Sequence, residues 1–258
     1  SSWKKHAQRI LLGSSSSVSK DTEDYPAIDR TPKLYIGGKQ ARPDSGYSLA
    51  VLDSKKRIAG EVGHGNRKDI RNAVEAAHKA SAWGSLNGHS RAQVLFFLAE
   101  NLEARREEFR KRISDLTRDS TPKATKQVDA AIRRIFSYAA WADKYEGRVH
   151  QPPMRGLALA IPEPFGVMGI IAPDEMPLLG LLSMILPCIA VGNRVVAVPS
   201  PRAALIATDF YQVLDTSDVP GGVINLVTGV PSELAAVLAA HDDVAAIWGI
   251  GPEDECAE

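Results

Sequence analysis

The chain has 258 residues, of which 44% are hydrophobic and 24% are charged, a composition typical of one folded domain with a sizeable core. Lysine and arginine number 31, and aspartate and glutamate also number 31, so no net charge favours nucleic acid or an anionic membrane. The two cysteines, Cys188 and Cys256, give neither a metal-ligand spacing nor a disulfide framework. We therefore expect a cytoplasmic protein without a metal site, and the longest uncharged apolar stretch, 176–192, is shorter than a membrane span requires.

The first thirty residues differ in composition from the rest of the chain. The segment from Ser1 to Lys20 is basic, contains Ser14–Ser17 and has no acidic residue. Two interpretations fit: a mitochondrial presequence, which is rich in Arg and Ser and poor in acids, or an interdomain linker with low apolar content. We favour a linker or flexible segment over residues 1–30, followed by one domain over residues 31–258.

The domain opens with β-strand signals and a capped helix. Residues 34–38 are a short apolar run, and 47–52 and 58–62 flank a charged turn, which predicts a hairpin. Asn66 is followed three positions later by Asp69, the spacing of a capping box, so we expect a helix to begin there. Apolar residues then recur at helical spacing, which predicts a helix with one buried face.

Two longer helices are expected next, over 90–112 and 121–145, because apolar residues recur on one face of each segment. A Thr-Pro pair opens the second helix, where proline is well tolerated. The first helix carries a basic cluster that could bind phosphate, but the glutamates between the basic residues favour a solvated helix face. Near the end of the second helix, we expect Trp141 and Tyr145 to pack as anchors.

Residues 162–200 form the stretch around which the chain is organised. Gly166–Ala172 is an apolar run between prolines, typical of a strand buried on both faces. Pro177 suits the first position of a helix, and the nearly continuous apolar run up to Ile189 predicts that this helix is buried. Arg194–Val198 is rich in β-branched residues and is expected to be the next strand. Such a unit predicts a ligand site at the carboxyl ends of the strands.

Strands and helices alternate after this unit. Helices are predicted over 202–213 and 232–240, and strands over 223–227 and 244–248. Alternation of this kind favours a parallel sheet covered by helices on both faces. The sequence therefore predicts an α/β fold with a doubly wound parallel sheet.

Several short motifs, in their order and spacing, carry a resemblance to a known family. They are Glu163-Pro164-x-Gly166-Val167, Pro173-x-x-x-Pro177, Pro187-x-x-Ala190-x-Gly192-Asn193-x-Val195-Val196, Pro199-Ser200 and Gly221-x-Val223-x-Asn225-x-Val227-x-Gly229. This series resembles the cofactor domain of the aldehyde dehydrogenase superfamily. It is most similar to the C-terminal module of the family 16 aldehyde dehydrogenases, a second, degenerate copy behind a complete dehydrogenase module. The resemblance implies a Rossmann-like cofactor domain with a projecting, oligomerisation-type β-hairpin over residues 148–164.

The chain departs from that family at polar positions. In active members, an Asn in the turn after the first strand of the unit donates to the oxyanion of the thiohemiacetal intermediate, and Glu175 stands in its place. Val198 and Pro201 replace the Lys and Glu that contact the adenosine ribose, and Pro252 replaces a Ser at the pyrophosphate. We therefore expect no bound cofactor, although active relatives use NAD. The resemblance implies vestigial cofactor-binding positions at Ile171, Ala172, Pro173, Pro199, Gly229 and Gly251.

No catalytic residue is predicted in this chain. The resemblance implies that the general-base Glu and the nucleophilic Cys of the family lie beyond Glu258, so we expect the catalytic domain to be absent and the chain to be a piece of a longer protein. Cys256 lies too early for that nucleophile and is expected to be an inert thiol. Asp174 and Glu175 could form an acid/base pair, but their place just before a helix favours helix capping and dipole compensation.

Two functions of different classes remain open on these grounds. The first is a non-catalytic aldehyde dehydrogenase-like module, a pseudoenzyme that acts in assembly or protein interaction. Its partner would be a second copy or a companion dehydrogenase module, bound through the 148–164 edge, although the hairpin could equally fold back on its own domain. The alternative is the cofactor-binding part of an active NAD-dependent aldehyde dehydrogenase that oxidises aldehydes to carboxylic acids.

Overall fold

The computed structural model describes residues 31–145 and 147–250, and the predicted linker at 1–30 lies outside them. In this part of the chain, the central sheet has the strand order β10-β7-β8-β9-β1-β2. Its strands are β1 (Leu34–Ile36), β2 (Lys39–Ala41), β7 (Val167–Ile171), β8 (Arg194–Val198), β9 (Ile224–Leu226) and β10 (Ala246–Gly249). The strands β10, β7, β8 and β9 pair in parallel, whereas β1 pairs antiparallel with both of its neighbours, β9 and β2. The predicted doubly wound α/β fold is confirmed, with an antiparallel edge added to the parallel strands.

Strand β8 shows why the sheet is covered on both faces. All five of its residues are buried. Val195 and Ala197 belong to the apolar cluster that includes the helix of the central unit, whereas Val196 and Val198 belong to a second cluster. Because successive side chains of a strand point to opposite faces, a strand with no polar residue after Arg194 requires helices on both sides.

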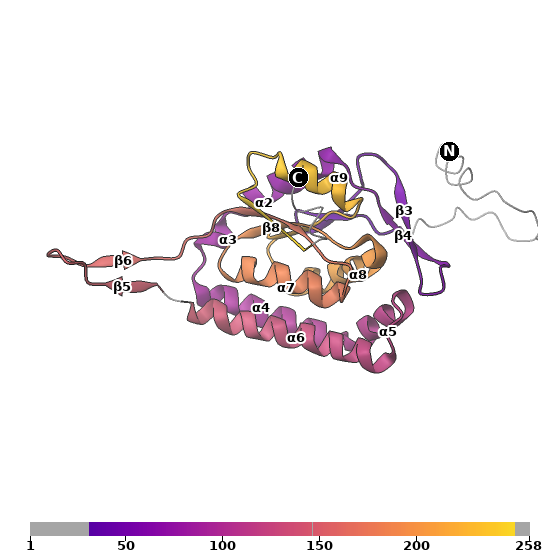
Figure 1. Cartoon of the computed structure of the whole chain (residues 1–258), viewed down its shortest axis with the longest axis horizontal. Helices are drawn as coiled ribbons and strands as arrows, with labels where there is room; N and C mark the ends of the chain where they lie inside the picture. The colour runs from indigo at the N-terminus through magenta and orange to yellow at the C-terminus, as the bar shows by residue number, and fades with distance from the viewer. Residues whose placement is uncertain (1–30, 146, 251–258) are drawn as a thin grey trace, which may run out of the picture. The chain divides into compact units, whose positions relative to one another are not determined.

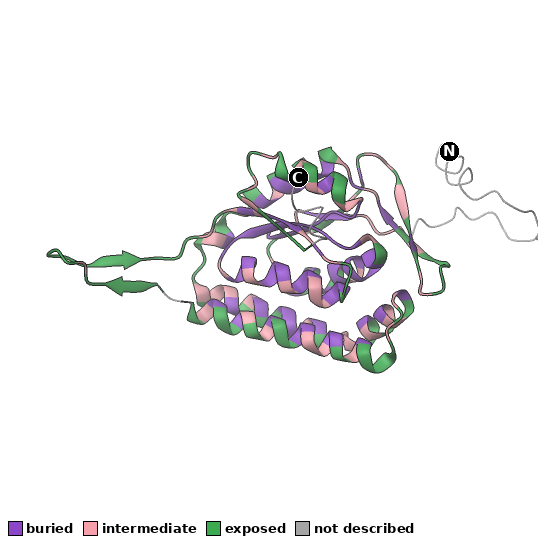
Figure 2. Cartoon of the chain, viewed as in Figure 1, coloured by how far each residue is buried: buried purple, intermediate pink, exposed green. Residues whose placement is uncertain are grey.

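The helices form layers on either side of the sheet (Figure 1). They are α2 (Arg67–Lys79), α3 (Ala82–Ser85), α4 (Gly88–Ala104), α5 (Arg106–Leu116), α6 (Thr121–Lys144), α7 (Pro177–Ala190), α8 (Ala204–Asp215) and α9 (Pro231–Ala239). Helices α2 and α9 cover one face, and α7 and α8 cover the other. Helix α6 packs on both α4 and α7. The outer helices α4 and α6 therefore bury one side only, as Figure 2 shows.

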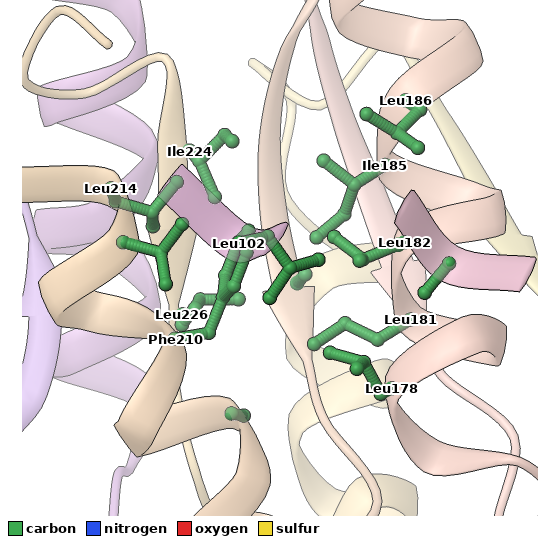
Figure 3. Packing of buried hydrophobic residues seen from close by; sticks show 14 of the residues in the cluster. Leu102, Leu178, Leu181, Leu182, Ile185, Leu186, Phe210, Leu214, Ile224 and Leu226 are labelled. Atoms are coloured by element: carbon green, nitrogen blue, oxygen red, sulfur yellow. The ribbon is translucent and has the colours of Figure 1, made fainter. Parts of the chain in front are cut away.

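The core on the α7 side is almost entirely aliphatic. Leucine and isoleucine side chains of α7 meet residues of α8, β9 and α4, as Figure 3 shows for Leu178, Leu181, Leu182, Ile185, Leu186, Phe210, Leu214, Ile224, Leu226 and Leu102. Burial of each such side chain contributes about 1.5 to 3 kcal/mol relative to exposure. The apolar run in the sequence is thus explained by packing and needs no ligand.

Two local predictions near the start of the domain are confirmed. The side-chain oxygen of Asn66 accepts from the backbone N–H of Lys68 at 2.8 Å and of Asp69 at 3.3 Å, and the Asp69 carboxylate accepts from the Asn66 N–H at 2.9 Å. This is a complete capping box at the start of α2. The predicted hairpin is β3 (Ser48–Leu52) paired with β4 (Ile58–Gly63).

The predicted helix over 90–112 is divided in the structure. Arg105, with φ −103° and ψ 14°, separates α4 from α5. The bend lets α5 pack against both α6 and α8, where Arg112 Nε lies 2.6 Å from a carboxylate oxygen of Asp209. Phe109 and Ile113 are fully buried there. The bend accompanies a contact with a helix about a hundred residues away in the sequence, which helical periodicity alone does not predict.

The predicted hairpin over 148–164 projects from the body of the domain (Figure 1). Strands β5 (Arg148–His150) and β6 (Ala158–Ala160) pair antiparallel, and every residue of both is exposed (Figure 2). The alternative, a hairpin folded back on its own domain, is therefore wrong. Trp141 and Tyr145 at the end of α6 were expected to be packing anchors, but they are 59% and 51% exposed. Their rings contact each other, with centroids 6.2 Å apart.

No helix in residues 31–145 and 147–250 combines the length and apolarity that a membrane span requires. No three His, Cys, Asp or Glu side chains in the described segments lie close enough together to hold a metal ion. Cys188 is a free, buried thiol within α7.

Candidate functional site

The carboxyl ends of the parallel strands define the candidate site. In open α/β sheets, ligands bind outside this edge, near the point where strand order reverses. Strands β7 and β8 lie at the centre of the parallel part, joined by α7, and end at Ile171 and Val198. Five of the predicted cofactor-binding positions lie at this edge. Ile171 is the last residue of β7, and the positions that follow the ends of β7, β8 and β9 are Ala172, Pro173, Pro199 and Gly229. The sixth, Gly251, lies outside the described residues, and contact of any of them with a cofactor stays a prediction.

A side-chain network joins the turns that follow β7 and β8. The hydroxyl of Ser200 donates to Oδ1 of Asp174 at 2.6 Å. Nε of Arg202 lies 2.9 Å from the other carboxylate oxygen, Oδ2. Ser200 is buried, whereas the side chains of Asp174 and Arg202 are 38% and 80% exposed. A buried hydroxyl thus fixes a surface carboxylate, which in turn holds a solvated guanidinium.

The expectation that the acidic pair caps α7 is wrong. The N-cap residue of α7 is Met176, in the left-handed region with φ 48° and ψ 60°, and no side chain caps the helix. This backbone conformation is uncommon for a residue other than glycine. Asp174 instead faces the end of β8, where it accepts a hydrogen bond from Ser200 and forms an ion pair with Arg202.

Glu175 occupies the turn with its side chain exposed. Among the described residues, it has no hydrogen-bond or ion-pair partner. An ionised carboxylate has no hydrogen to donate, so the Glu175 side chain in that form cannot stabilise an oxyanion through a hydrogen bond. The turn therefore carries a carboxylate at the position where the resemblance implies an oxyanion donor.

Gly229 and Ala172 have structural explanations. A Cβ at Gly229 would lie 2.6 Å from Cδ1 of Leu234, so the absence of a side chain lets α9 pack closely against the end of β9. The Ala172 N–H donates to the Val198 carbonyl at 3.0 Å, which extends the β7–β8 ladder by one residue. At the first turn of α9, Glu233 supplies a negative charge to the helix N-terminus. These positions shape the edge but add no cation to it.

The residues present fit one end of a nicotinamide dinucleotide. A dinucleotide bound at such an edge places its adenosine ribose near the carboxyl end of the second strand of a β-α-β unit. Arg202 lies there and offers a cation, whereas the buried Ser200 hydroxyl fixes Asp174. The predicted pyrophosphate position at Pro252 lies outside the described residues. Glu175 does not fit the oxyanion role.

This architecture is that of a dinucleotide-binding domain of the doubly wound class. The sequence profile of the aldehyde dehydrogenase family matches residues 44–254, and the chain belongs to that family, as the motifs predicted. It is 33% identical to the hydroxyisobutyraldehyde dehydrogenase of Mycolicibacterium austroafricanum over 85% of its length and 44% of that protein.

Solved structures share the fold. Betaine aldehyde dehydrogenase of Staphylococcus aureus, in complex with NAD⁺, has a TM-score of 0.81 at 23% identity, covering 85% of this chain and 46% of that one. The NAD-dependent aldehyde dehydrogenase of Sinorhizobium meliloti has a TM-score of 0.81 at 25% identity, covering 86% and 45%. The chain spans less than half the length of these relatives, which agrees with the expectation that it carries the cofactor-side half of the fold.

The expectation of no cofactor is wrong. The related structure from S. aureus contains NAD⁺, and the protein from S. meliloti is NAD-dependent. The prediction gave full weight to a few side chains, such as Glu175 and Val198. A dinucleotide lies along a whole strand edge and also depends on shape and backbone groups, which those substitutions leave in place.

Sequence reasoning missed Arg202 as the ion-pair partner of Asp174. The signal was available, since Arg202 is the only charged residue between 195 and 208. Its partner Asp174 is distant in sequence, so the ion pair itself required the structure.

Proposed function

We propose that this chain is the cofactor half of an aldehyde dehydrogenase-like module that holds a nicotinamide dinucleotide, does not turn over aldehydes, and joins an assembly through its β5–β6 hairpin. In this proposal it corresponds to the second, degenerate module of a family 16 aldehyde dehydrogenase. The observation that carries the proposal is the exposed, unpaired carboxylate of Glu175 in the turn after β7.

The energetic argument concerns the developing oxyanion. Loss of a single oxyanion donor lowers kcat by about 10² to 10³. A carboxylate about 4 Å from an oxyanion would add a repulsion of about 4 kcal/mol at the effective dielectric constant of a protein surface. Both effects act on the transition state more than on the bound dinucleotide. A site can therefore keep its cofactor while it loses turnover.

The cofactor half contributes binding and orientation to such a site. A nicotinamide ring, when bound, accepts a hydride. The residues of this chain would hold the adenosine end, with Arg202 just after the end of β8 and Ser200 fixing its partner Asp174. The two prolines, Pro173 and Pro199, limit the freedom of the turns that follow β7 and β8.

The hairpin supports a role in assembly. Val149, Leu157, Leu159 and Ile161 are 69%, 74%, 64% and 70% exposed. Apolar side chains on a projecting two-stranded hairpin with unpaired edges favour pairing with another chain. The partner we propose is a second copy of this module or a companion dehydrogenase module, in the cytoplasm.

The experiment that tests the proposal measures binding and turnover on the full chain. Calorimetric titration with NAD⁺ and with NADP⁺ should give saturable binding to at least one of them. The same protein, mixed with that dinucleotide and a panel of aldehydes, should form no reduced cofactor by absorbance. Formation of reduced cofactor above the protein-free rate would reject a non-catalytic module.

The second candidate is the cofactor-binding part of an active NAD-dependent aldehyde dehydrogenase. The likeness to the NAD⁺ complex of the S. aureus enzyme favours it. A longer protein that carries this chain would then oxidise aldehydes to carboxylic acids, and Glu175→Asn in that protein would raise its rate. Under the first proposal, Glu175→Asn changes neither binding of the dinucleotide nor the absence of turnover in this chain.

A further inference from the structure

We infer that Arg202 contacts the adenosine ribose of the bound cofactor and, by binding a 2′-phosphate there, makes this site prefer NADP⁺ to NAD⁺. When no dinucleotide is bound, the partner of Arg202 is Asp174. This inference rests on the proposed binding of a dinucleotide at the carboxyl edge, and deepens it by naming which dinucleotide is held.

The position of Arg202 is the first argument. Strand β7, helix α7 and strand β8 form one β-α-β unit, and β8 ends at Val198. In doubly wound nucleotide-binding domains, an acidic residue near the end of the second strand bonds the ribose 2′-hydroxyl of NAD, whereas an arginine there accommodates the 2′-phosphate of NADP. Residues 199–208 contain no acidic residue and one cation, Arg202. The residue types at this strand end thus favour a phosphate.

The guanidinium of Arg202 is accessible to a ligand. Its side chain is 80% exposed, and its Nε lies 2.9 Å from Oδ2 of Asp174. In the described part of the chain, the two terminal nitrogens have no hydrogen-bond partner. Arginine binds phosphate most strongly through two parallel N–H donors, and those donors remain free here.

Asp174 can be replaced by a phosphate as the partner of Arg202. Its Oδ1 accepts from the buried Ser200 hydroxyl, so the carboxylate stays in place whether or not Arg202 contacts it. An ion pair this exposed adds little stability, whereas a charge-assisted, bidentate contact to phosphate is stronger. Arg202 can therefore leave Asp174 for a phosphate while Ser200 keeps the carboxylate satisfied.

Other charges at this place are acidic. Glu175 follows Asp174 in the same turn and is exposed. Both carboxylates repel a phosphate, and within this network of described residues Arg202 is the group that attracts one. Removal of the Asp174 charge should consequently strengthen NADP⁺ binding.

The test is calorimetric titration of the full chain with NAD⁺ and with NADP⁺. We expect NADP⁺ to bind about tenfold more tightly, in line with one charge-assisted contact. Arg202→Ala should lower NADP⁺ affinity about tenfold and change NAD⁺ affinity less than twofold. Arg202→Lys should keep part of the preference, and Asp174→Asn should increase NADP⁺ affinity. Arg118→Ala, which removes an exposed arginine between α5 and α6, is the control of equal charge change and should alter neither affinity.

The outcomes separate the two proposals. If neither dinucleotide binds, the proposed function and this inference both fail. If NAD⁺ binds as tightly as NADP⁺, or if Arg202→Ala weakens both equally, the preference is overturned while dinucleotide binding stands. Thermal unfolding of each variant checks the fold, and an exposed side chain such as Arg202 should leave the midpoint unchanged.

Discussion

Replacement of Asn225 by alanine should destabilise the domain strongly, although the side chain touches no proposed ligand. Asn225 lies on β9 and is fully buried. Its side-chain oxygen accepts from the Gly37 N–H at 2.9 Å, in the turn between β1 and β2. Its amide group donates to the carbonyls of Gly222 at 2.8 Å and Val195 at 3.2 Å. One side chain thus ties β8 and β9 to the antiparallel edge of the sheet.

The expected magnitude follows from these three contacts. Each intramolecular hydrogen bond contributes about 0.5 to 1.5 kcal/mol, and a buried partner left unsatisfied adds to the loss. We predict that Asn225→Ala lowers the free energy of unfolding by about 2 to 4 kcal/mol, a large part of the roughly 5 to 15 kcal/mol typical of a domain.

Urea denaturation followed by circular dichroism measures this change. Asn72→Ala is the matched control, because Asn72 is an exposed residue of α2, and its replacement should change stability by less than about 0.5 kcal/mol. A loss below about 1 kcal/mol for Asn225→Ala would refute the structural role given to this side chain.

Three further predictions concern other parts of the chain. Leu159→Asp should reduce the oligomer mass in light scattering without lowering the thermal midpoint, because this hairpin side chain is 64% exposed; an unchanged mass would count against assembly through the hairpin. Burial raises the pKa of the Cys188 thiol to about 11, so in a Cys256→Ser background this thiol should react with a thiol reagent at neutral pH only when the protein unfolds. Because the unfolded thiol ionises at lower pH than the buried one, the free energy of unfolding should fall as pH rises from about 9 to 11. Rapid labelling of the native state would disprove the burial of Cys188. Asn66→Ala should lower the free energy of unfolding by about 1 kcal/mol in urea through loss of the capping box, and no loss would mean that water replaces the cap.

The fold was predictable where local pattern and burial agree. Strand β8 has the predicted bounds, Arg194–Val198, because an apolar run between a glycine-containing turn and a proline has few alternatives. The capping box of Asn66 depends on residues three positions apart, so the sequence contains all that is needed to recognise it. The prediction that the hairpin projects from the domain came from the family resemblance, since nothing in the composition of the hairpin indicates whether it projects or folds back.

The site was less predictable because its contacts are long-range. Asp174 was assigned to helix capping by sequence proximity, but its partners are the Ser200 hydroxyl and the Arg202 guanidinium, which the β7–β8 pairing brings near. The left-handed conformation of Met176 turns the chain in that direction, and methionine gives no signal for it. The expectation of no cofactor was wrong for a different reason. It inferred the loss of dinucleotide binding along a whole sheet edge from a few substituted side chains.

A structure of the full chain grown with NADP⁺ would test the central claim most directly. The account predicts an ordered dinucleotide along the carboxyl ends of β7 and β8, with its 2′-phosphate contacting Arg202 and with Glu175 remaining in solvent. An edge that stays free of dinucleotide at saturating concentration, or a dinucleotide bound elsewhere on the chain, would contradict it.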